Sequence, residues 1–95
     1  MGLKEEFQEH AEKARTLPST TTNESLLIIY GLYKQATVGP ININFPGVFQ
    51  PTVVFERERS KWDAWKAVEG KSQEEAMSDY IAKIKQLLEE AAAAE

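Results

Sequence analysis

The chain has 95 residues, no cysteine, a single histidine and a formal net charge of −4 at pH 7. This length suits one domain spanning residues 1–95, and the lack of cysteine excludes disulfide frameworks, thiolate nucleophiles and cysteine-based zinc sites. One histidine also excludes a two-histidine metal site. No segment approaches 18 apolar residues and the first residues lack a signal-peptide apolar region, so we expect a soluble, cytoplasmic protein with no stable membrane insertion.

The charge is unevenly distributed along the chain. Residues 1–29 have a net charge of −2 and residues 72–95 of −4, whereas residues 30–71 carry six basic and four acidic side chains. The acidic total argues against nucleic acid and anionic membranes as partners. The basic middle of the chain is compatible with a smaller anion.

The first predicted element is a helix from Leu3 to Leu17, because its apolar residues recur at spacings of three and four. Pro18 is expected to end it, since proline disfavours the helical conformation in the preceding residue. The polar residues 19–23 then form a loop with N-cap candidates. His10 lies beside the apolar face and has no obvious nucleophile to activate, so we interpret it as structural or solvated.

The next segment, residues 25–36, is apolar nearly all round, so its periodicity does not separate a buried strand from a buried helix. Its length and the upstream cap favour a helix, which Gly39 and Pro40 would end. Tyr30, Tyr33 and Lys34 share one face of this helix. They are either core aromatics with a snorkelling lysine, or a site where a ring stacks on a base and the cation binds phosphate.

Residues 40–58 are predicted to form a long packed loop, because three prolines interrupt residues 40–51. A short hairpin is the competing interpretation, since Ile41, Ile43 and Phe45 alternate with polar residues. The apolar residues at positions 53–55 are expected to turn towards the core.

Two further helices are predicted after this loop. Trp62, Trp65 and Val68 indicate a helix from Glu58 to Val68, in which the tryptophans are more plausible as core than as ligand-stacking residues. Ser72 and Glu75 form a capping box that opens the last helix. The apolar stripe of that helix comprises Met77, Tyr80, Ile81, Ile84, Leu87, Leu88 and Ala91.

No catalytic constellation is present in this sequence. The serines lie in caps or loops, most carboxylates lie at solvent-facing helical positions, and the five scattered glycines match neither phosphate-binding fingerprint. We therefore expect a binding protein without enzymatic activity, metal or cofactor. Lys61, which precedes Trp62, could supply a second cation beside Lys34. Tyr80 interrupts an aliphatic stripe with a polar-tipped ring, which suits a cavity wall.

Three sequence blocks together resemble the acyl-CoA-binding protein family. They are Tyr30-Gly31-Leu32-Tyr33-Lys34-Gln35-Ala36-Thr37-Val38-Gly39, Lys61-Trp62-Asp63-Ala64-Trp65, and Glu75-Ala76-Met77 followed by Tyr80-Ile81. The resemblance covers nearly the whole chain. It implies an all-α, four-helix, up-down-down-up bundle with a long loop between helices two and three. It also implies a monomer that binds one medium- or long-chain acyl-CoA ester unchanged, as an intracellular carrier and pool former.

The resemblance also implies roles for individual residues. Tyr30, Lys34 and Lys61 would hold the ribose 3′-phosphate, Tyr33 would stack on the adenine, and Tyr80 would line the cavity. Gly31 and Leu32 fall inside the binding segment, and a side chain at Gly31 would crowd the nucleotide. The remaining implied contacts are Leu26 and Leu27 near the acyl chain or thioester, Phe7 and Ala11 on the facing wall, and Arg15 and Arg57 as peripheral phosphate contacts.

The chain departs from the family pattern between Gly39 and Lys61, where it is several residues longer than is usual. This longer segment leaves a second function open, in which residues 45–56 form a protein-docking patch around Val53, Val54 and Phe55. Binding that does not respond to acyl-CoA would distinguish such a module from a carrier.

Overall fold

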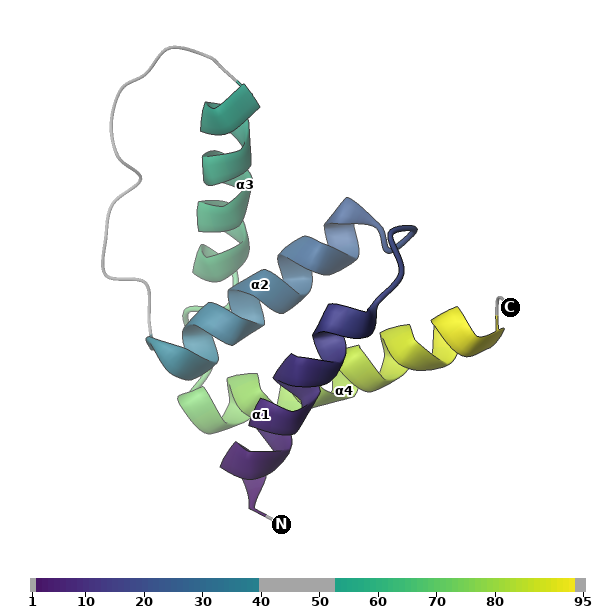
Figure 1. The fold of residues 1–95 in the computed structure, drawn as a ribbon. Coiled ribbons are helices and arrows are strands. Elements are labelled where there is room, and N and C mark those ends of the chain that lie inside the picture. Colours follow the sequence, from purple (N-terminus) through teal and green to yellow (C-terminus); the bar gives the residue numbers. More distant parts are fainter. Residues whose placement is uncertain (1, 40–52, 94–95) are drawn as a thin grey trace.

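The protein consists of four α-helices in the part of the chain that the structure describes. A computed structural model describes residues 2–39 and 53–93, and within the third helix it describes side chains from Arg59 onward. The elements are α1 (Leu3–Lys13), a single 3₁₀ turn η1 (Ala14–Thr16), α2 (Asn23–Thr37), α3 (Val53–Lys66) and α4 (Gln73–Ala93). Figure 1 shows α1 and α4 running towards one end of the molecule and α2 and α3 towards the other, the expected up-down-down-up order.

Local signals set the ends of α1, α2 and α4. The α-helical part of α1 stops at Lys13, four residues earlier than expected, and η1 tightens the chain before Pro18. Thr22 caps α2 by accepting a hydrogen bond from the Ser25 amide at 3.1 Å. At the other end, Gly39 adopts a positive φ of 101°. This left-handed conformation suits glycine after the end of a helix.

The capping box at the start of α4 is confirmed. The Ser72 hydroxyl accepts from the Glu75 amide at 3.0 Å, and the Glu75 carboxylate accepts from the Ser72 amide at 3.2 Å. Two backbone donors at the start of α4 are thereby satisfied reciprocally.

The prediction for α3 was wrong at both ends. The helix begins at Val53, within the segment expected to be a loop, and ends at Lys66 rather than Val68. The loop was predicted from the three prolines of residues 40–51, but the last of them, Pro51, precedes Val53 and does not prevent a helix that begins there. The expected loop at residues 40–52, and the side chains of Val53, Val54, Phe55 and Arg57, lie outside the described residues.

The core lies between α1, α2 and α4. Both α1 and α2 pack against α4, while α3 packs against the other side of α2. The expected stripe on α4 is largely confirmed, with Ala76 as an addition. The core residues are Phe7, Ile29, Leu32, Ala36, Ala76, Tyr80, Ile81, Ile84 and Leu87.

Helix α2 is less buried than its apolar sequence suggests. Leu26, Ile28 and Tyr33 each expose more than two-fifths of their surface, whereas Ile29, Leu32 and Ala36 are buried. The exposed apolar residues of α2 therefore lie beside the core, where a ligand or partner could cover them.

Candidate ligand-binding site

The contact between α2 and α3 depends on Gly31. A Cβ at this position would touch the backbone oxygen of Ala64, and it would lie 2.8 Å from the Ala64 carbonyl carbon and 3.2 Å from the Trp65 nitrogen. Only a residue without a side chain permits this approach. Helix packing is thus a sufficient reason for this glycine, and the sequence interpretation, in which a side chain at Gly31 would crowd a nucleotide, stays a prediction.

Side-chain amides and an indole hold the end of α2 against the chain that follows α3. The Trp65 indole N–H donates to the Gly39 carbonyl at 3.0 Å. Gln35 is fully buried, and its Nε2 donates to the Lys71 carbonyl at 2.5 Å and to the Glu69 carbonyl at 3.3 Å. These long-range bonds fix α3 relative to α2, and thereby fix the residues that the two helices present to each other.

Two ammonium groups converge on Tyr30 where α3 crosses α2. Lys34 Nζ lies 6.0 Å and Lys61 Nζ 5.7 Å from the centre of the Tyr30 ring. Lys34 Nζ also lies 5.8 Å from the Trp65 ring. We call Tyr30, Lys34 and Lys61 the cation cluster. The structure thus brings together three residues that are 31 positions apart at most in the sequence.

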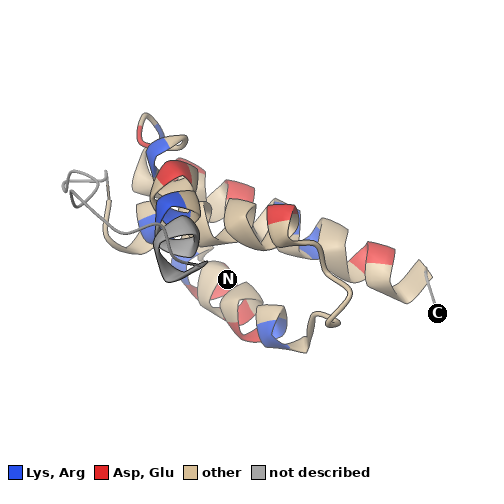
Figure 2. Ribbon diagram, turned by 90° about the horizontal axis from the view of Figure 1, so that it is seen from above, with Lys and Arg blue, Asp and Glu red and all other residues tan. Residues whose placement is uncertain are grey.

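The cation cluster is suited to an anion. Among the described residues, no carboxylate forms an ion pair with Lys34. An anion that reaches both ammonium groups would accept charge-assisted hydrogen bonds from them. Figure 2 shows acidic residues recurring along α1 and α4, while α3 carries several basic ones.

A second group of predicted residues forms an aromatic cluster beneath the exposed surface of α2. Phe7 and Tyr33 stack with ring centres 5.7 Å apart, and Phe7 meets the edge of Tyr80 at 5.0 Å. Tyr33 remains 42% exposed, whereas Phe7 and Tyr80 are buried. Tyr33 therefore presents a ring supported from behind, and aromatic pairs in such offset or edge-on arrangements are favourable.

Burial also affects the ionisation of Tyr80. Loss of solvation raises the pKa of its hydroxyl above 10.0, and the neighbouring Tyr33 raises it further. The Tyr80 hydroxyl is consequently neutral at physiological pH and is able to donate a hydrogen bond.

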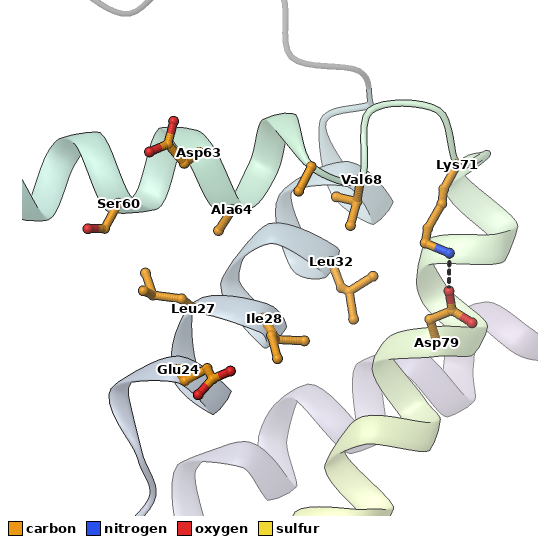
Figure 3. Close-up of a pocket in the computed structure, with 11 residues that line it drawn as sticks. Glu24, Leu27, Ile28, Leu32, Ser60, Asp63, Ala64, Val68, Lys71 and Asp79 are labelled. Carbon is orange, nitrogen blue, oxygen red and sulfur yellow. Dashed lines mark ion pairs between the residues drawn. The ribbon is translucent and has the colours of Figure 1, made fainter.

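Two of the concave surfaces on the described residues are lined by predicted site residues of α2. The first, between α1 and α2, has a volume of about 570 Å³, and we call it the α1–α2 hollow. It is lined by Phe7, Ala11, Tyr33 and Thr37, together with Gln8 and acidic residues of α1. The second is an apolar groove of about 580 Å³ between α2 and α3 (Figure 3).

The other predicted site residues lie in different surroundings. Leu26 is 42% exposed, Leu27 is half-buried in the groove, and Leu32 belongs to the core and also lines the groove. Arg15 is an exposed residue of η1 whose guanidinium lies 3.9 Å from the Glu12 carboxylate. The structure does not bring Arg15 into contact with the cation cluster in the part of the chain it describes, and the side chain of Arg57 lies outside that part.

Sequence reasoning missed three residues with evident roles at this site. Gln35 was passed over, although a polar residue within an apolar helix is a detectable signal. The indole of Trp65, expected only as core, both anchors Gly39 and faces Lys34. No sequence pattern indicated that Ile28 would be exposed, because its exposure depends on where α3 lies. His10 is buried and hydrogen-bonds the Glu6 carbonyl through Nδ1 at 2.8 Å, which confirms the structural interpretation.

Neither a metal cluster nor a membrane-spanning helix is found in residues 2–39 and 53–93. No three histidine, cysteine or acidic side chains there are grouped closely enough to hold a metal ion. No helix of this region combines the length and apolar character that crossing a bilayer requires.

Comparison with known proteins adds four similarities. Residues 4–84 match the family model described as acyl CoA binding protein. The chain is 72% identical to an acyl-CoA-binding protein of Ricinus communis, over 98% of both chains. It also resembles the crystal structure of Oryza sativa acyl-CoA-binding protein 2, with a TM-score of 0.89 and 64% identity over 99% of both chains. A Moniliophthora perniciosa relative has a TM-score of 0.77 and 36% identity, over 96% of this chain and 84% of its own.

Proposed function

The chain belongs to the acyl-CoA-binding protein family, and from this premise we propose that it binds acyl-CoA esters without changing them chemically. The observation that carries the proposal is the convergence of Lys34 and Lys61 on Tyr30. Coenzyme A carries a ribose 3′-phosphate with nearly two negative charges at neutral pH, which two ammonium groups and a phenol can bind together.

We propose that Tyr33 stacks on the adenine of the same ligand. Its ring is exposed on one side and supported by Phe7 on the other. A supported ring loses little conformational freedom when a base stacks on it, and base stacking on an aromatic side chain contributes about 1–3 kcal/mol. Tyr33 lies one turn of α2 from Tyr30, so the base and the phosphate of one nucleotide can reach both residues.

The acyl chain is proposed to follow the α1–α2 hollow and the exposed apolar surface near Leu26. Phe7 and Ala11 of α1 form the wall that faces Tyr33. Each buried methylene contributes about 0.8 kcal/mol, so two further carbons would increase affinity by roughly tenfold or slightly more, as long as the surface covers them. Medium and long chains are therefore the expected ligands. Arg15 and Arg57 remain proposed peripheral contacts, which would act mainly through long-range attraction and be sensitive to salt.

In the cell we propose a monomeric carrier and pool former for acyl-CoA in lipid metabolism, located in the cytoplasm. The acidic ends of the chain would disfavour nucleic acid and anionic membranes, while the few cations beside Tyr30 suffice for a small polyanion. Acyl-CoA is the ligand in this proposal, and no cofactor is required.

Titration calorimetry with palmitoyl-CoA tests the proposal. Lys34→Ala and Lys61→Ala should each weaken binding by more than tenfold, because each removes a charge-assisted contact of about 1.5–3 kcal/mol. Lys66→Ala is the matched control on α3, since Lys66 pairs with Glu69 at 3.2 Å and lies over a different ring. The control should change affinity less than twofold.

The 3′-dephospho form of the same ester identifies the phosphate as the recognised group. The wild-type protein should bind it more than tenfold more weakly than palmitoyl-CoA, and the Lys34→Ala/Lys61→Ala double variant should lose most of that discrimination. No heat with palmitoyl-CoA would contradict acyl-CoA binding. Equal discrimination in wild type and double variant would place the phosphate elsewhere.

A further inference from the structure

Ser60 is an exposed serine of α3 to which the proposed function assigns no role. It lines the groove between α2 and α3, across from Leu27 of α2 (Figure 3). Leu27 shares one face of α2 with Tyr30 and Lys34, because these residues follow one another at spacings of three and four. Ser60 therefore lies on the side of α2 that carries the cation cluster, and it directly precedes Lys61 of that cluster.

The residues before Ser60 form a basic recognition sequence. Arg57 and Arg59 precede the serine by three positions and by one position. No other serine or threonine of the chain has arginine three positions before it. Protein kinases select substrates partly by charge pattern, and a kinase with an acidic substrate cleft binds arginines at such positions when the chain is extended. Positions 57–60 thus suit an arginine-directed serine kinase.

Ser60 precedes the part of α3 that is fixed to α2. The close contact with Gly31 is made by the backbone of Ala64 and Trp65. The Trp65 indole also donates to the Gly39 carbonyl. The turns of α3 before these residues extend beyond α2 in Figure 1. A helix end that projects from the packed part of a domain opens at a lower free-energy cost than the core, so a kinase can reach Ser60 by local opening of α3.

We propose that Ser60 is a phosphorylation site whose phosphate lowers the affinity of the protein for acyl-CoA, an inference that rests on the proposed function. In the modification the Ser60 hydroxyl oxygen attacks the γ-phosphorus of ATP, and the bond from that phosphorus to the oxygen of the leaving ADP breaks. The hydroxyl proton passes to a carboxylate base of the kinase. The products are phosphoserine and ADP, and the kinase supplies the base and the Mg²⁺.

The added phosphate would lie among acidic groups and next to a cation that the ligand needs. It carries about 1.5 to 2 negative charges at neutral pH. Glu24 and Asp63 line the same groove as Ser60 (Figure 3), so a third acidic group there strengthens the repulsion of an anionic ligand. Lys61 is the next residue of α3, and the phosphate would compete with the ribose 3′-phosphate for its ammonium. Both effects lower the affinity for coenzyme A esters.

Incubation of the full chain with a purified arginine-directed serine kinase, ATP and Mg²⁺, followed by mass spectrometry, tests the modification. The folded protein should incorporate phosphate at Ser60, and Arg57→Ala should slow this incorporation at least tenfold. A peptide of residues 53–66 is the positive control for the kinase. Phosphorylation of the peptide but not of the folded protein would overturn the site. Equal rates in wild type and Arg57→Ala would overturn the recognition argument.

Titration calorimetry with palmitoyl-CoA tests the effect of the phosphate. The phosphorylated protein should bind about fivefold more weakly than the unmodified protein at low salt, and the difference should shrink as salt is raised, because salt screens the repulsion. Kinase-treated Ser60→Ala should bind as untreated Ser60→Ala does. A protein synthesised with phosphorylated Ser78 is the matched control. Ser78 is exposed on α4 and two residues from Tyr80, so the two side chains face nearly opposite directions, and this phosphate should change the affinity less than twofold.

The outcomes separate this inference from the proposed function. No binding of palmitoyl-CoA by the unmodified protein would contradict both. Binding by the unmodified protein, with an affinity within twofold after phosphorylation of Ser60 at low salt, would overturn the inference alone. Equal losses from phosphorylated Ser60 and phosphorylated Ser78 would overturn the argument from position, and a loss that does not respond to salt would overturn the argument from charge.

Discussion

Gly31→Ala tests the α2–α3 contact on which the candidate site depends. The added Cβ would lie 2.8 Å from the Ala64 carbonyl carbon, whereas ordinary contact begins at 3.4 Å. The opposing atoms are backbone, so α3 would have to move by at least about 0.6 Å. Such overpacking costs about 1–3 kcal/mol, and a clash with backbone belongs at the upper end. The higher helix propensity of alanine offsets about 1 kcal/mol of this loss of stability.

The expected net loss is about 2 kcal/mol, which corresponds to a decrease in Tm of roughly 8–16 °C for a domain of this size. Differential scanning calorimetry of the unliganded protein measures it, with urea unfolding as a second readout. Gly70→Ala is the matched control, since no atom lies within 4 Å of a Cβ there and only Gly39 has a positive φ among the described glycines. That control should stay within about 0.5 kcal/mol of wild type.

The sign of the change in stability distinguishes helix packing from other reasons for the glycine at position 31. If α2 and α3 did not approach closely, Gly31→Ala would stabilise the protein by about 1 kcal/mol, as at an exposed helical position. If the glycine served only to leave room for a nucleotide, the unliganded protein would likewise be stabilised by about 1 kcal/mol and only palmitoyl-CoA affinity would fall. Either result would refute the packing argument. The expected result includes a parallel loss of affinity, because displacement of α3 carries Lys61 away from Tyr30.

Three further changes test the elements around the site. Ser72→Ala removes the N-cap of α4 and should lower stability by about 1 kcal/mol in thermal unfolding. Trp65→Phe leaves the Gly39 carbonyl without its indole donor, and should cost about 1–3 kcal/mol in urea unfolding. Burial raises the pKa of Tyr80 in the folded state, so its contribution is fully present below pH 10.0 and is lost as pH rises from there through the folded-state pKa. The Tm of the wild type should therefore fall when the pH is raised from 8 to above 10.0, and Tyr80→Phe should show a smaller fall.

The serine and tryptophan changes each have a control on the same element. Ser78→Ala on exposed α4 surface should be neutral or slightly stabilising. Trp62→Phe should cost less than Trp65→Phe, because the Trp62 ring is only half-buried. An unchanged Tm in Ser72→Ala, equal losses in the two tryptophan variants, or an unchanged alkaline loss in Tyr80→Phe would each contradict the corresponding argument.

Local rules predicted α1, α2 and α4 because their signals lie within a few residues of one another. Thr22 and the Ser72–Glu75 pair cap helices through bonds that span three positions. The start of α3 was not predictable in this way. Its first residues, Val53 and Val54, have low helix propensity, and no cap was recognised upstream.

The residues of the candidate site were likewise predictable from local rules only in part. Tyr30 and Lys34 were assigned to one face from their spacing, since helical geometry fixes the angle between residues i and i+4. The position of Lys61 beside them depends on the α2–α3 packing at Gly31 and on the bonds from Trp65 and Gln35, which join residues 26 to 36 positions apart. The family resemblance supplied this grouping in advance, whereas spacing alone did not.

The sequence by itself determined that residues 25–36 form a helix and which of its side chains share a face. Only the tertiary structure decided which of those apolar faces are covered. Ile29, Leu32 and Ala36 pack into the core, whereas Leu26, Ile28 and Tyr33 remain exposed beside the hollow and the groove. The physical reason is that periodicity fixes directions around one helix axis, while burial depends on which distant segments pack against each direction.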